Sequence, residues 1–236
     1  MRVEKFGDLE ATLAGGSDGK GGGDGPIVVL LHGFGAPGDD LVPLARAISA
    51  PEGTRFVFPR APLSLPGMFG DARAWWMIDL EKLERDLAAG RPRDRSAEEP
   101  EGLPEARAAM ANFLADVDAR LGASMPMVLG GFSQGAMLAL DTALHAEREL
   151  AGVGLLSGTL LAADLWLPRM KARAGLPVFQ SHGRADPLLP FSIAERLRDA
   201  LQDAGLPVSW IPFEGGHEIP PQVLAALGEF FAEHLR

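Results

Sequence analysis

Residues 127–140 read MVLGGFSQGAMLAL, a short apolar run followed by a glycine-rich turn and an apolar helical pattern. Within it, residues 131–135 form the pattern G-x-S-x-G around Ser133. A serine on a sharp strand-to-helix turn is held in a strained backbone conformation that lifts its hydroxyl above the sheet. Gly131 and Gly135 leave room where strand and helix cross closely. The stretch predicts a nucleophile at a strand–helix junction, and the alternative is a glycine-rich turn with a solvent-facing serine.

Apolar runs and helical patterns alternate along most of the chain. Six runs read as continuous apolar strands rather than alternating ones, which is typical of a parallel sheet covered on both faces. These runs are 27–31, 54–58, 126–131, 151–156, 176–181 and 206–213. Three segments carry apolar residues at helical spacing, namely 103–121, 191–204 and 221–235. The alternation predicts an α/β fold with a mostly parallel, doubly wound sheet and helices on both faces.

The length of 236 residues is compatible with a single α/β domain over 1–236. The low-complexity run AGGSDGKGGGDGP at 14–26 is expected to be a flexible loop. Its Gly-Lys pair does not make a phosphate-binding loop, because Gly21 stands where a serine or threonine would have to bind magnesium. Segment 60–102 is rich in Pro, Arg, Asp and Glu, and we expect it to leave the sheet as an excursion with a solvated charged face.

The composition narrows the classes of partner. The formal net charge is −10, which makes nucleic acid and anionic membranes poor partners. There is no cysteine, so disulfides, thiolate metal sites and a cysteine nucleophile are excluded. The N-terminus lacks the apolar core of a signal peptide, and no stretch approaches the length of a membrane span. We expect a soluble cytoplasmic protein without stable membrane insertion.

A serine nucleophile needs a general base, and the base needs an acid that orients it. In α/β-hydrolases the acid and then the base follow the serine in the chain. His217 meets this order, because it follows an apolar strand and a Gly-Gly turn in PFEGGHEIPP. Order or setting argues against the other four histidines, which are His32, His145, His182 and His234. Asp186, in the turn of FQSHGRADPLLP, is the preferred acid, and Asp164, after the preceding strand, is the alternative.

Acyl transfer from such a serine also needs two backbone N–H donors for the developing oxyanion. One donor follows the nucleophile, which makes it Gln134, and the other comes from the loop after an early strand. The loop HGFGAPG at 32–38 makes Phe34 the expected second donor.

The glycines of this loop, at 33, 35 and 38, also have the spacing G-x-G-x-x-G of a dinucleotide site. A dinucleotide site should have an acidic residue at the end of the next strand, where this chain has Pro59 and Arg60. Asp39 and Asp40 would repel a phosphate at the start of the following helix. We therefore interpret the glycines as part of an oxyanion hole. The sequence HEIPP at 217–221 imitates a zinc helix but has Pro221 in place of the second histidine, so neither a metal nor a cofactor is predicted.

Six motifs together resemble the carboxylesterase/lysophospholipase family of α/β-hydrolases, which includes the acyl-protein thioesterases. They are LHGFGA (31–36), FPRAP (58–62), WW (75–76), GFSQGA (131–136), HGRADPLLP (182–190) and GGHEIP (215–220). The motifs run in the family's order over about 26–236. The resemblance implies a lidless α/β-hydrolase that cleaves short- to medium-chain acyl esters or thioesters without a cofactor. It also implies Ser133, Asp186 and His217 as a catalytic triad, with the amides of Phe34 and Gln134 as oxyanion donors.

The chain departs from the best-known members of that family in a charged insertion at 82–102 and in the absence of cysteine. Apolar residues on the excursion are candidates for the wall of an acyl pocket, and the alternative is that they cap the core. These residues are Leu63, Met68, Phe69, Trp75 and Trp76. The expected partner is a small acyl ester or thioester, and the resemblance leaves a homodimer open. Lysophospholipase, acyl-protein thioesterase and peptidase activities stay open within this chemistry. A nicotinamide-dependent oxidoreductase and a non-catalytic binding module are the rival classes.

Overall fold

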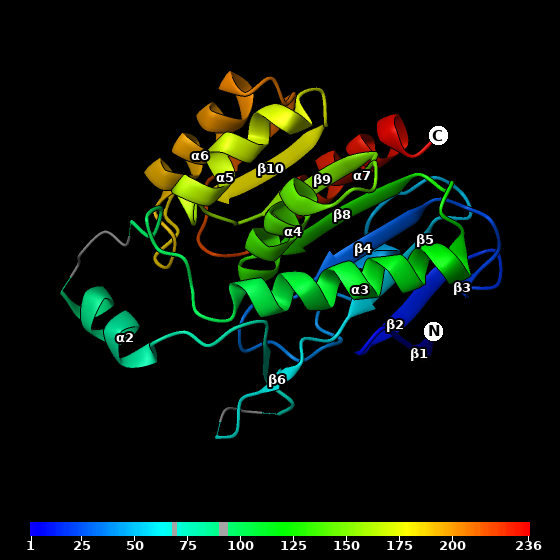
Figure 1. The fold of residues 1–236 in the computed structure, drawn as a ribbon, viewed down its shortest axis with the longest axis horizontal. Coiled ribbons are helices and arrows are strands. Elements are labelled where there is room, and N and C mark those ends of the chain that lie inside the picture. The colour runs from blue at the N-terminus through cyan, green and yellow to red at the C-terminus, as the bar shows by residue number, and fades with distance from the viewer. Residues whose placement is uncertain (68–69, 90–93) are drawn as a thin grey trace.

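A computed structural model describes residues 1–67, 70–89 and 94–236 of the chain (Figure 1). A nine-stranded sheet has the order β1-β2-β5-β4-β8-β9-β10-β11, with β3 paired to β2. Its strands are β1 (Arg2–Phe6), β2 (Leu9–Gly16), β3 (Lys20–Gly22), β4 (Ile27–Leu31), β5 (Arg55–Pro59), β8 (Met127–Phe132), β9 (Gly152–Leu156), β10 (Val178–Gly183) and β11 (Val208–Phe213). The six strands from β5 to β11 in this order are parallel, whereas β2 is antiparallel to β1 and β5 and parallel to β3. The predicted α/β fold with a mostly parallel sheet is confirmed.

The continuous apolar strands owe their composition to helices on both sides of the sheet. Every residue of β4 and β9 is buried. One face of the sheet packs against α3 (Leu103–Leu121), α4 (Gln134–His145), α5 (Ala163–Met170) and α6 (Phe191–Asp203). The other face packs against α1 (Leu44–Ala47) and α7 (Pro221–His234), which lies behind the sheet in Figure 1. The three helices predicted from spacing are α3, α6 and α7, and α3 begins and ends at the predicted residues.

The N-terminal segment differs from the prediction. The expected loop at 14–26 contains the end of β2 and the whole of β3. Gly15 and Gly16 have φ of +67° and +68°, and a Cβ on either would meet backbone atoms of a neighbouring strand or turn. Glycine permits both this backbone conformation and this close approach, so a run that looks like a linker takes part in the sheet.

The excursion after β5 forms a small layer of its own. Strands β6 (Leu63–Ser64) and β7 (Arg73–Ala74) pair with each other, and Pro37 forms an isolated bridge with Ala72. Helix α2 (Leu80–Ala88) stands away from the rest of the fold in Figure 1. The chain returns to the body beyond residue 94, where the carbonyls of Ser96 and Glu98 accept the amides of Ala163 and Ala162. No helix among the described residues is both long and apolar enough to cross a membrane.

Candidate active site

Ser133 sits on a sharp turn between β8 and α4. Its φ is +56°, a left-handed value that a residue with a side chain adopts only when the surroundings impose it. Its amide donates to the carbonyl of Leu156 on β9 at 2.9 Å. A Cβ on Gly131 would lie 2.6 Å from the carbonyl oxygen of Leu31, and a Cβ on Gly135 would overlap that same oxygen. Both glycines are therefore required for β8 and α4 to approach β4 this closely.

His217 and Asp186 are brought together by the loops that follow β11 and β10. The Nδ1–H of His217 donates to Oδ2 of Asp186 at 2.7 Å. The loops are joined by the amide of Ala185, which donates to the carbonyl of Gly215 at 2.9 Å, and Gly183 allows their backbones to touch. The imidazole packs on the ring of Phe132 with centroids 4.8 Å apart, which puts it beside the residue that precedes Ser133. Asp164, the alternative acid, is exposed in the first turn of α5.

The carboxylate of Asp186 is fully buried and accepts hydrogen bonds from three N–H groups. Its Oδ1 accepts the amides of Leu188 and Leu189 at 2.8 and 2.9 Å. Its Oδ2 accepts His217 and lies 3.3 Å from Nε2 of His182. Burial alone would raise the pKa of Asp186, but the hydrogen bond and charge of His217 and the two amides outweigh burial and hold the pKa below its usual value. The group is therefore a stable anion that can orient an imidazole.

His182 is a second histidine on this carboxylate, which sequence order alone set aside. Its side chain is fully buried, and Nε2 also lies 2.8 Å from the carbonyl of Leu189, so Nε2 carries the hydrogen. Burial lowers the pKa of His182, which keeps the ring neutral. A neutral ring fixes the Asp186 turn without adding a competing charge. The short spacing of HGRAD was the available signal, because i and i+4 in a tight turn can face each other.

The loop at 32–36 lies directly against the serine turn. A Cβ on Gly33 would be 3.4 Å from the Cβ of Ser133. Among the described residues, the amides of Phe34 and Gln134 donate to no protein acceptor, so both remain available to a substrate oxygen. The Phe34 side chain is half-buried against Leu65, Ala72 and Ala74.

The side chain of His32 holds this loop in place through two hydrogen bonds. Its Nδ1 lies 2.8 Å from the carbonyl of Gly33, and its Nε2 accepts the amide of Ala61 at 3.1 Å. These partners fix the neutral tautomer with hydrogen on Nδ1, and burial lowers the pKa of His32 in agreement. The imidazole of His32 thus links the loop beside Ser133 to the segment that follows β5.

The side chain of Gln134 joins the serine turn to the excursion. Its Oε1 accepts the amide of Trp75 and its Nε2 donates to the carbonyl of Trp76, both at 2.9 Å. The indole Nε1–H of Trp75 in turn donates to the carbonyl of His32 at 2.9 Å. No sequence pattern indicates this bridge, because the partners of Gln134 lie about sixty residues away and meet it only once the chain has folded.

The structure treats the five predicted pocket residues differently. Leu63 is 38% exposed on β6, as a surface that meets a substrate would be. Trp75 and Trp76 are 2% and 1% exposed in the main core, which favours the alternative that they cap the core. Met68 and Phe69 lie outside the described residues. Contact of any of the five with an acyl chain stays a prediction.

The glycine-rich loop does not have the form of a dinucleotide site. After Gly38 the first helix, α1, begins only at Leu44 and has four residues. A Cβ on Gly38 would collide with the side chain of Arg60, so this glycine serves packing against the end of β5. No helix N-terminus is available at the glycines to receive a pyrophosphate.

The sheet order, the strained serine turn and the acid and histidine on the following loops define an α/β-hydrolase fold. The chain belongs to the phospholipase/carboxylesterase family, whose model matches residues 20–235. This is a family of esterase and thioesterase hydrolases, so the chain is an enzyme of that group.

Named relatives agree with this assignment. The chain is 28% identical over 218 residues to acyl-protein thioesterase 1 of Neurospora crassa, covering 88% of this chain and 86% of the relative. It is 30% identical to a probable carboxylesterase of Oryza sativa subsp. japonica, covering 89% of this chain and 78% of the relative. The crystal structure of esterase PE8 superposes with a TM-score of 0.77 at 30% identity, covering 96% of this chain and 99% of that chain. A carboxylesterase from Mesorhizobium loti, at 21% identity and a TM-score of 0.72, covers 98% and 99% and shares the fold.

Proposed function

We propose that the chain is a serine hydrolase of short- to medium-chain acyl esters, with Ser133 as nucleophile, His217 as general base and Asp186 as the orienting acid. One observation carries the proposal: His217 donates a 2.7 Å hydrogen bond to the buried carboxylate of Asp186 while its ring packs beside the strained turn of Ser133. Strain at a turn that carries a serine supports a role for that serine, because backbone strain is retained where function requires it.

The first half of the reaction acylates the serine. Oγ of Ser133 attacks the acyl carbon while its proton passes to Nε2 of His217, and Asp186 stabilises the resulting imidazolium. The carbonyl electron pair moves onto oxygen, where the amides of Phe34 and Gln134 donate to it. The intermediate then collapses, the bond to the leaving oxygen breaks, and that oxygen takes the proton from His217.

The second half releases the acid. A water molecule gives a proton to His217 and its oxygen attacks the acyl carbon, so the same two amides hold the second oxyanion. When the bond to Oγ breaks, the proton returns from His217 to Ser133 and the carboxylic acid leaves. No metal or redox group is needed for any of these transfers.

A thioester is the second candidate substrate, because a thiolate leaves in the same way as an alkoxide. The likeness to acyl-protein thioesterase 1 of Neurospora crassa favours an S-acylated protein as that thioester. A lysophospholipid is a further ester within the same chemistry. The exposed Leu63 on β6 supports an apolar contact for an acyl chain near the excursion.

A substrate panel tests the proposal and ranks these candidates. Purified protein and its Ser133→Ala variant are compared on p-nitrophenyl esters of graded chain length, acyl-CoA thioesters and a lysophospholipid. We expect turnover of the shorter esters by the wild type and background rates from the variant at an unchanged melting temperature. Substantial turnover by the variant would contradict the assignment of Ser133. Preference for acyl-CoA or lysophospholipid would move the substrate to the corresponding alternative.

A further inference from the structure

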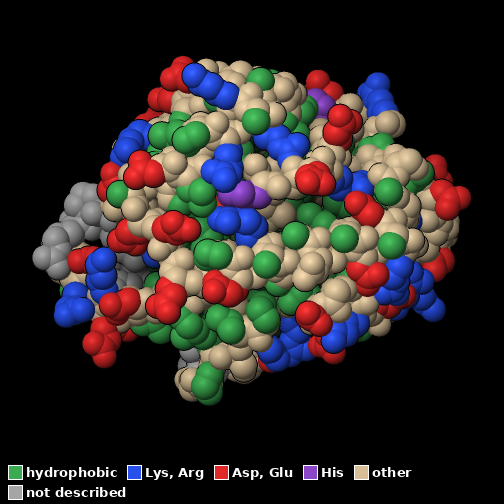
Figure 2. Space-filling view, in the orientation of Figure 1, with side chains coloured by type: hydrophobic (Ala, Val, Ile, Leu, Met, Phe, Trp, Pro, Cys, Tyr) green, Lys and Arg blue, Asp and Glu red, His purple; other side chains and the backbone are tan. Residues whose placement is uncertain are grey.

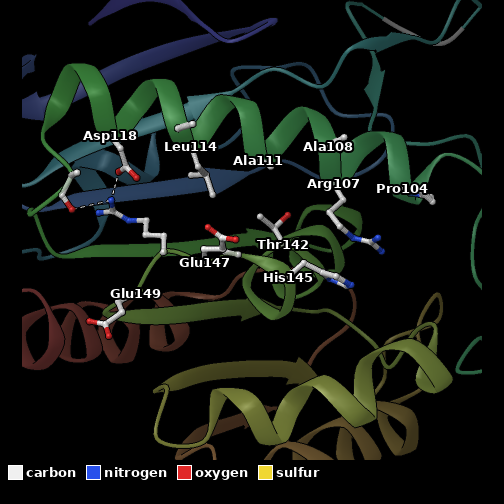
Figure 3. A pocket seen from close by; sticks show the side chains of 14 residues that line it. Pro104, Arg107, Ala108, Ala111, Leu114, Asp118, Thr142, His145, Glu147 and Glu149 are labelled. Atoms are coloured by element: carbon white, nitrogen blue, oxygen red, sulfur yellow. Dashed lines mark hydrogen bonds and ion pairs between the residues drawn. The ribbon is translucent and has the colours of Figure 1, made fainter.

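A second concave site lies between α3 and α4, at the end of α4 that is farthest from Ser133 (Figure 3). This α3–α4 groove has a volume of about 800 Å³, within the range of about 300–1,000 Å³ typical of small-molecule sites. Thr142, the first residue of α4 that lines the groove, follows Ser133 by nine residues, a separation of roughly 14 Å along the helix. The groove is lined by Pro104, Arg107, Ala108, Ala111, Leu114, Ala115, Asp118, Ala123, Thr142, His145, Ala146, Glu147, Arg148 and Glu149.

One wall of the α3–α4 groove is a stripe of small apolar side chains. Ala108, Ala111 and Ala115 recur at spacings of three and four on α3 and are exposed. The short side chains leave a channel beside the helix, and Figure 2 shows hydrophobic side chains along the course of α3 among acidic and basic ones. An apolar body of a ligand would cover this stripe.

The two arginines of the groove are already paired within the protein. Arg107 donates through Nε and Nη2 to the buried carboxylate of Asp141, at 2.5 and 3.0 Å. Arg148 pairs with Asp118 and also donates to the carbonyls of Ala123 and Met125. Both cationic charges are therefore matched before any ligand arrives.

The acidic groups of the groove are not matched in this way. Glu147 and Glu149 are exposed, and neither forms an ion pair or hydrogen bond with another described residue. Figure 3 shows the carboxylate of Glu147 directed toward α3, whereas that of Glu149 is directed away from α3. The uncompensated charge of the groove is consequently negative, in a protein whose formal net charge is −10.

Three further polar atoms of the groove lack hydrogen-bond partners although they are buried: Oγ1 of Thr142, Nε2 of His145 and the N–H donor Nε of Arg148. Thr142 is 2% exposed, extends from α4 toward α3 in Figure 3, and its Oγ1 has no hydrogen-bond partner. Nε2 of His145, one turn further along α4, is unpartnered as well. Nδ1 of His145 lies 2.7 Å from the carbonyl of Asp141, which can only accept, so in the neutral ring Nε2 is a free acceptor. Buried polar atoms without partners are costly and uncommon in native proteins, and they indicate a missing partner.

We propose that the α3–α4 groove binds a small amphiphilic organic cation, an alkyl or arylalkyl ammonium. Its apolar body lies on the alanine stripe of α3, and its N–H donors meet the carboxylate of Glu147, while Glu149 adds negative charge beside the groove. The same donors reach Oγ1 of Thr142 and Nε2 of His145 once side chains at the groove floor rotate. A carboxylate ligand of the same size would face the two unmatched glutamates, and a neutral alcohol would leave their charge uncompensated.

The test compares n-octylammonium, octanoate and octan-1-ol, which share a chain length and differ in charge, by titration calorimetry on the whole protein. Saturable binding is expected for octylammonium and absent for octanoate. The Glu147→Gln/Glu149→Gln variant should bind octylammonium at least tenfold more weakly. Ala111→Phe, which fills the channel from an exposed helix position, should have the same effect.

The matched control is Glu52→Gln/Glu229→Gln, which makes the same charge change at exposed positions on the loop before β5 and on α7. It should change the affinity less than twofold. Melting temperatures of all variants establish that each has folded. The proposal is overturned if octanoate binds as well as octylammonium, if octylammonium shows no saturable binding, or if both groove variants retain its affinity. None of these results depends on ester hydrolysis, so the proposed function stands or falls separately.

Discussion

Helix α4 begins at the candidate active site and ends at the α3–α4 groove, and its own polar side chains differ between the two ends: Gln134 has both side-chain polar atoms paired, whereas Thr142 and His145 each keep an atom without a partner. At the first end, the side-chain amide of Gln134 makes two hydrogen bonds and the carboxylate of Asp186 accepts several N–H groups. At the other end, Oγ1 of Thr142 and Nε2 of His145 have no partner. The groups that position Ser133 and His217 are held by hydrogen bonds within the protein, because rearrangement during the reaction would raise the barrier. A site that receives a ligand keeps some polar groups unpaired for that ligand.

The largest effect is expected for Asp186, the acid of the candidate active site. Asp186→Asn retains an acceptor for the amides of Leu188 and Leu189 but favours the wrong tautomer of His217. Loss of the orienting carboxylate in a serine triad lowers turnover by about 10⁴-fold. Turnover of a p-nitrophenyl ester at saturation measures the effect, with Asp164→Asn as the matched control at full activity. A loss below tenfold in the Asp186 variant would remove that residue from the triad.

The close packing of the serine turn gives the next effect. In Gly135→Ala the new methyl group meets the carbonyl oxygens of Leu31 and His32, which belong to the backbone and cannot move aside cheaply. Overpacking of this kind costs about 3 kcal/mol of unfolding free energy. Gly154→Ala is the control, because its methyl group would have 3.7 Å to the nearest atom and should cost about 1 kcal/mol or less. Urea unfolding distinguishes the two, and equal costs would contradict the close contact of α4 with β4.

The buried histidines predict a pH dependence of stability. Burial lowers the pKa of His32 and His182 in the folded chain from an ordinary value of 6.5, so the unfolded chain binds more protons in acid. Stability is therefore full above pH 6.5 and falls as the pH drops below it, by up to about 1.4 kcal/mol per pH unit for each histidine.

His182→Gln isolates one of these contributions. Urea unfolding of the variant between pH 7 and pH 5 should show a shallower loss of stability than the wild type. The variant should also lower turnover more than it changes KM, because His182 positions the Asp186 turn. An unchanged slope would mean that folding does not lower the pKa of His182.

The smallest effect, an increase in unfolding free energy, is expected for Thr142 in the α3–α4 groove. Thr142→Val keeps the side-chain shape and removes a buried hydroxyl that has no partner. The unfolding free energy should rise by about 1 kcal/mol, since an unsatisfied buried polar group costs about 1–3 kcal/mol. Thermal unfolding of the free protein measures the change. A fall in stability would show that the hydroxyl is already satisfied and would weaken the contrast between the two ends of α4.

Much of the fold was predictable because its parallel core is built from local patterns. The six apolar runs all became strands, and the spacing of apolar residues placed α3 at its observed bounds. The end of β2 and the whole of β3 escaped prediction because the glycines of 14–26 resemble a linker, whereas their positive φ values let that segment follow its neighbours in the sheet. Local composition does not distinguish a glycine that is free from one that is tightly packed.

The candidate active site likewise contains residues that the sequence predicts and residues that it does not. Ser133, Asp186 and His217 follow from chain order and turn chemistry, and the loops bring Asp186 and His217 together. The second layer around them differs: His32 and the Gln134 side chain depend on partners far away in the sequence, whereas His182 contacts Asp186 only four residues on. The groove residues carry no motif at all, because unmatched hydrogen-bonding groups become visible only after every other partner has been assigned.

The central claim is that Ser133 is a nucleophile activated by His217, and covalent labelling tests it most directly. Intact-mass spectrometry of protein treated with a fluorophosphonate follows one adduct per chain, and peptide mapping locates it. The account predicts complete labelling at Ser133, none in Ser133→Ala, and labelling slowed at least a hundredfold in His217→Gln with the fold intact. Labelling at another residue, or an unchanged rate in the His217 variant, would contradict it.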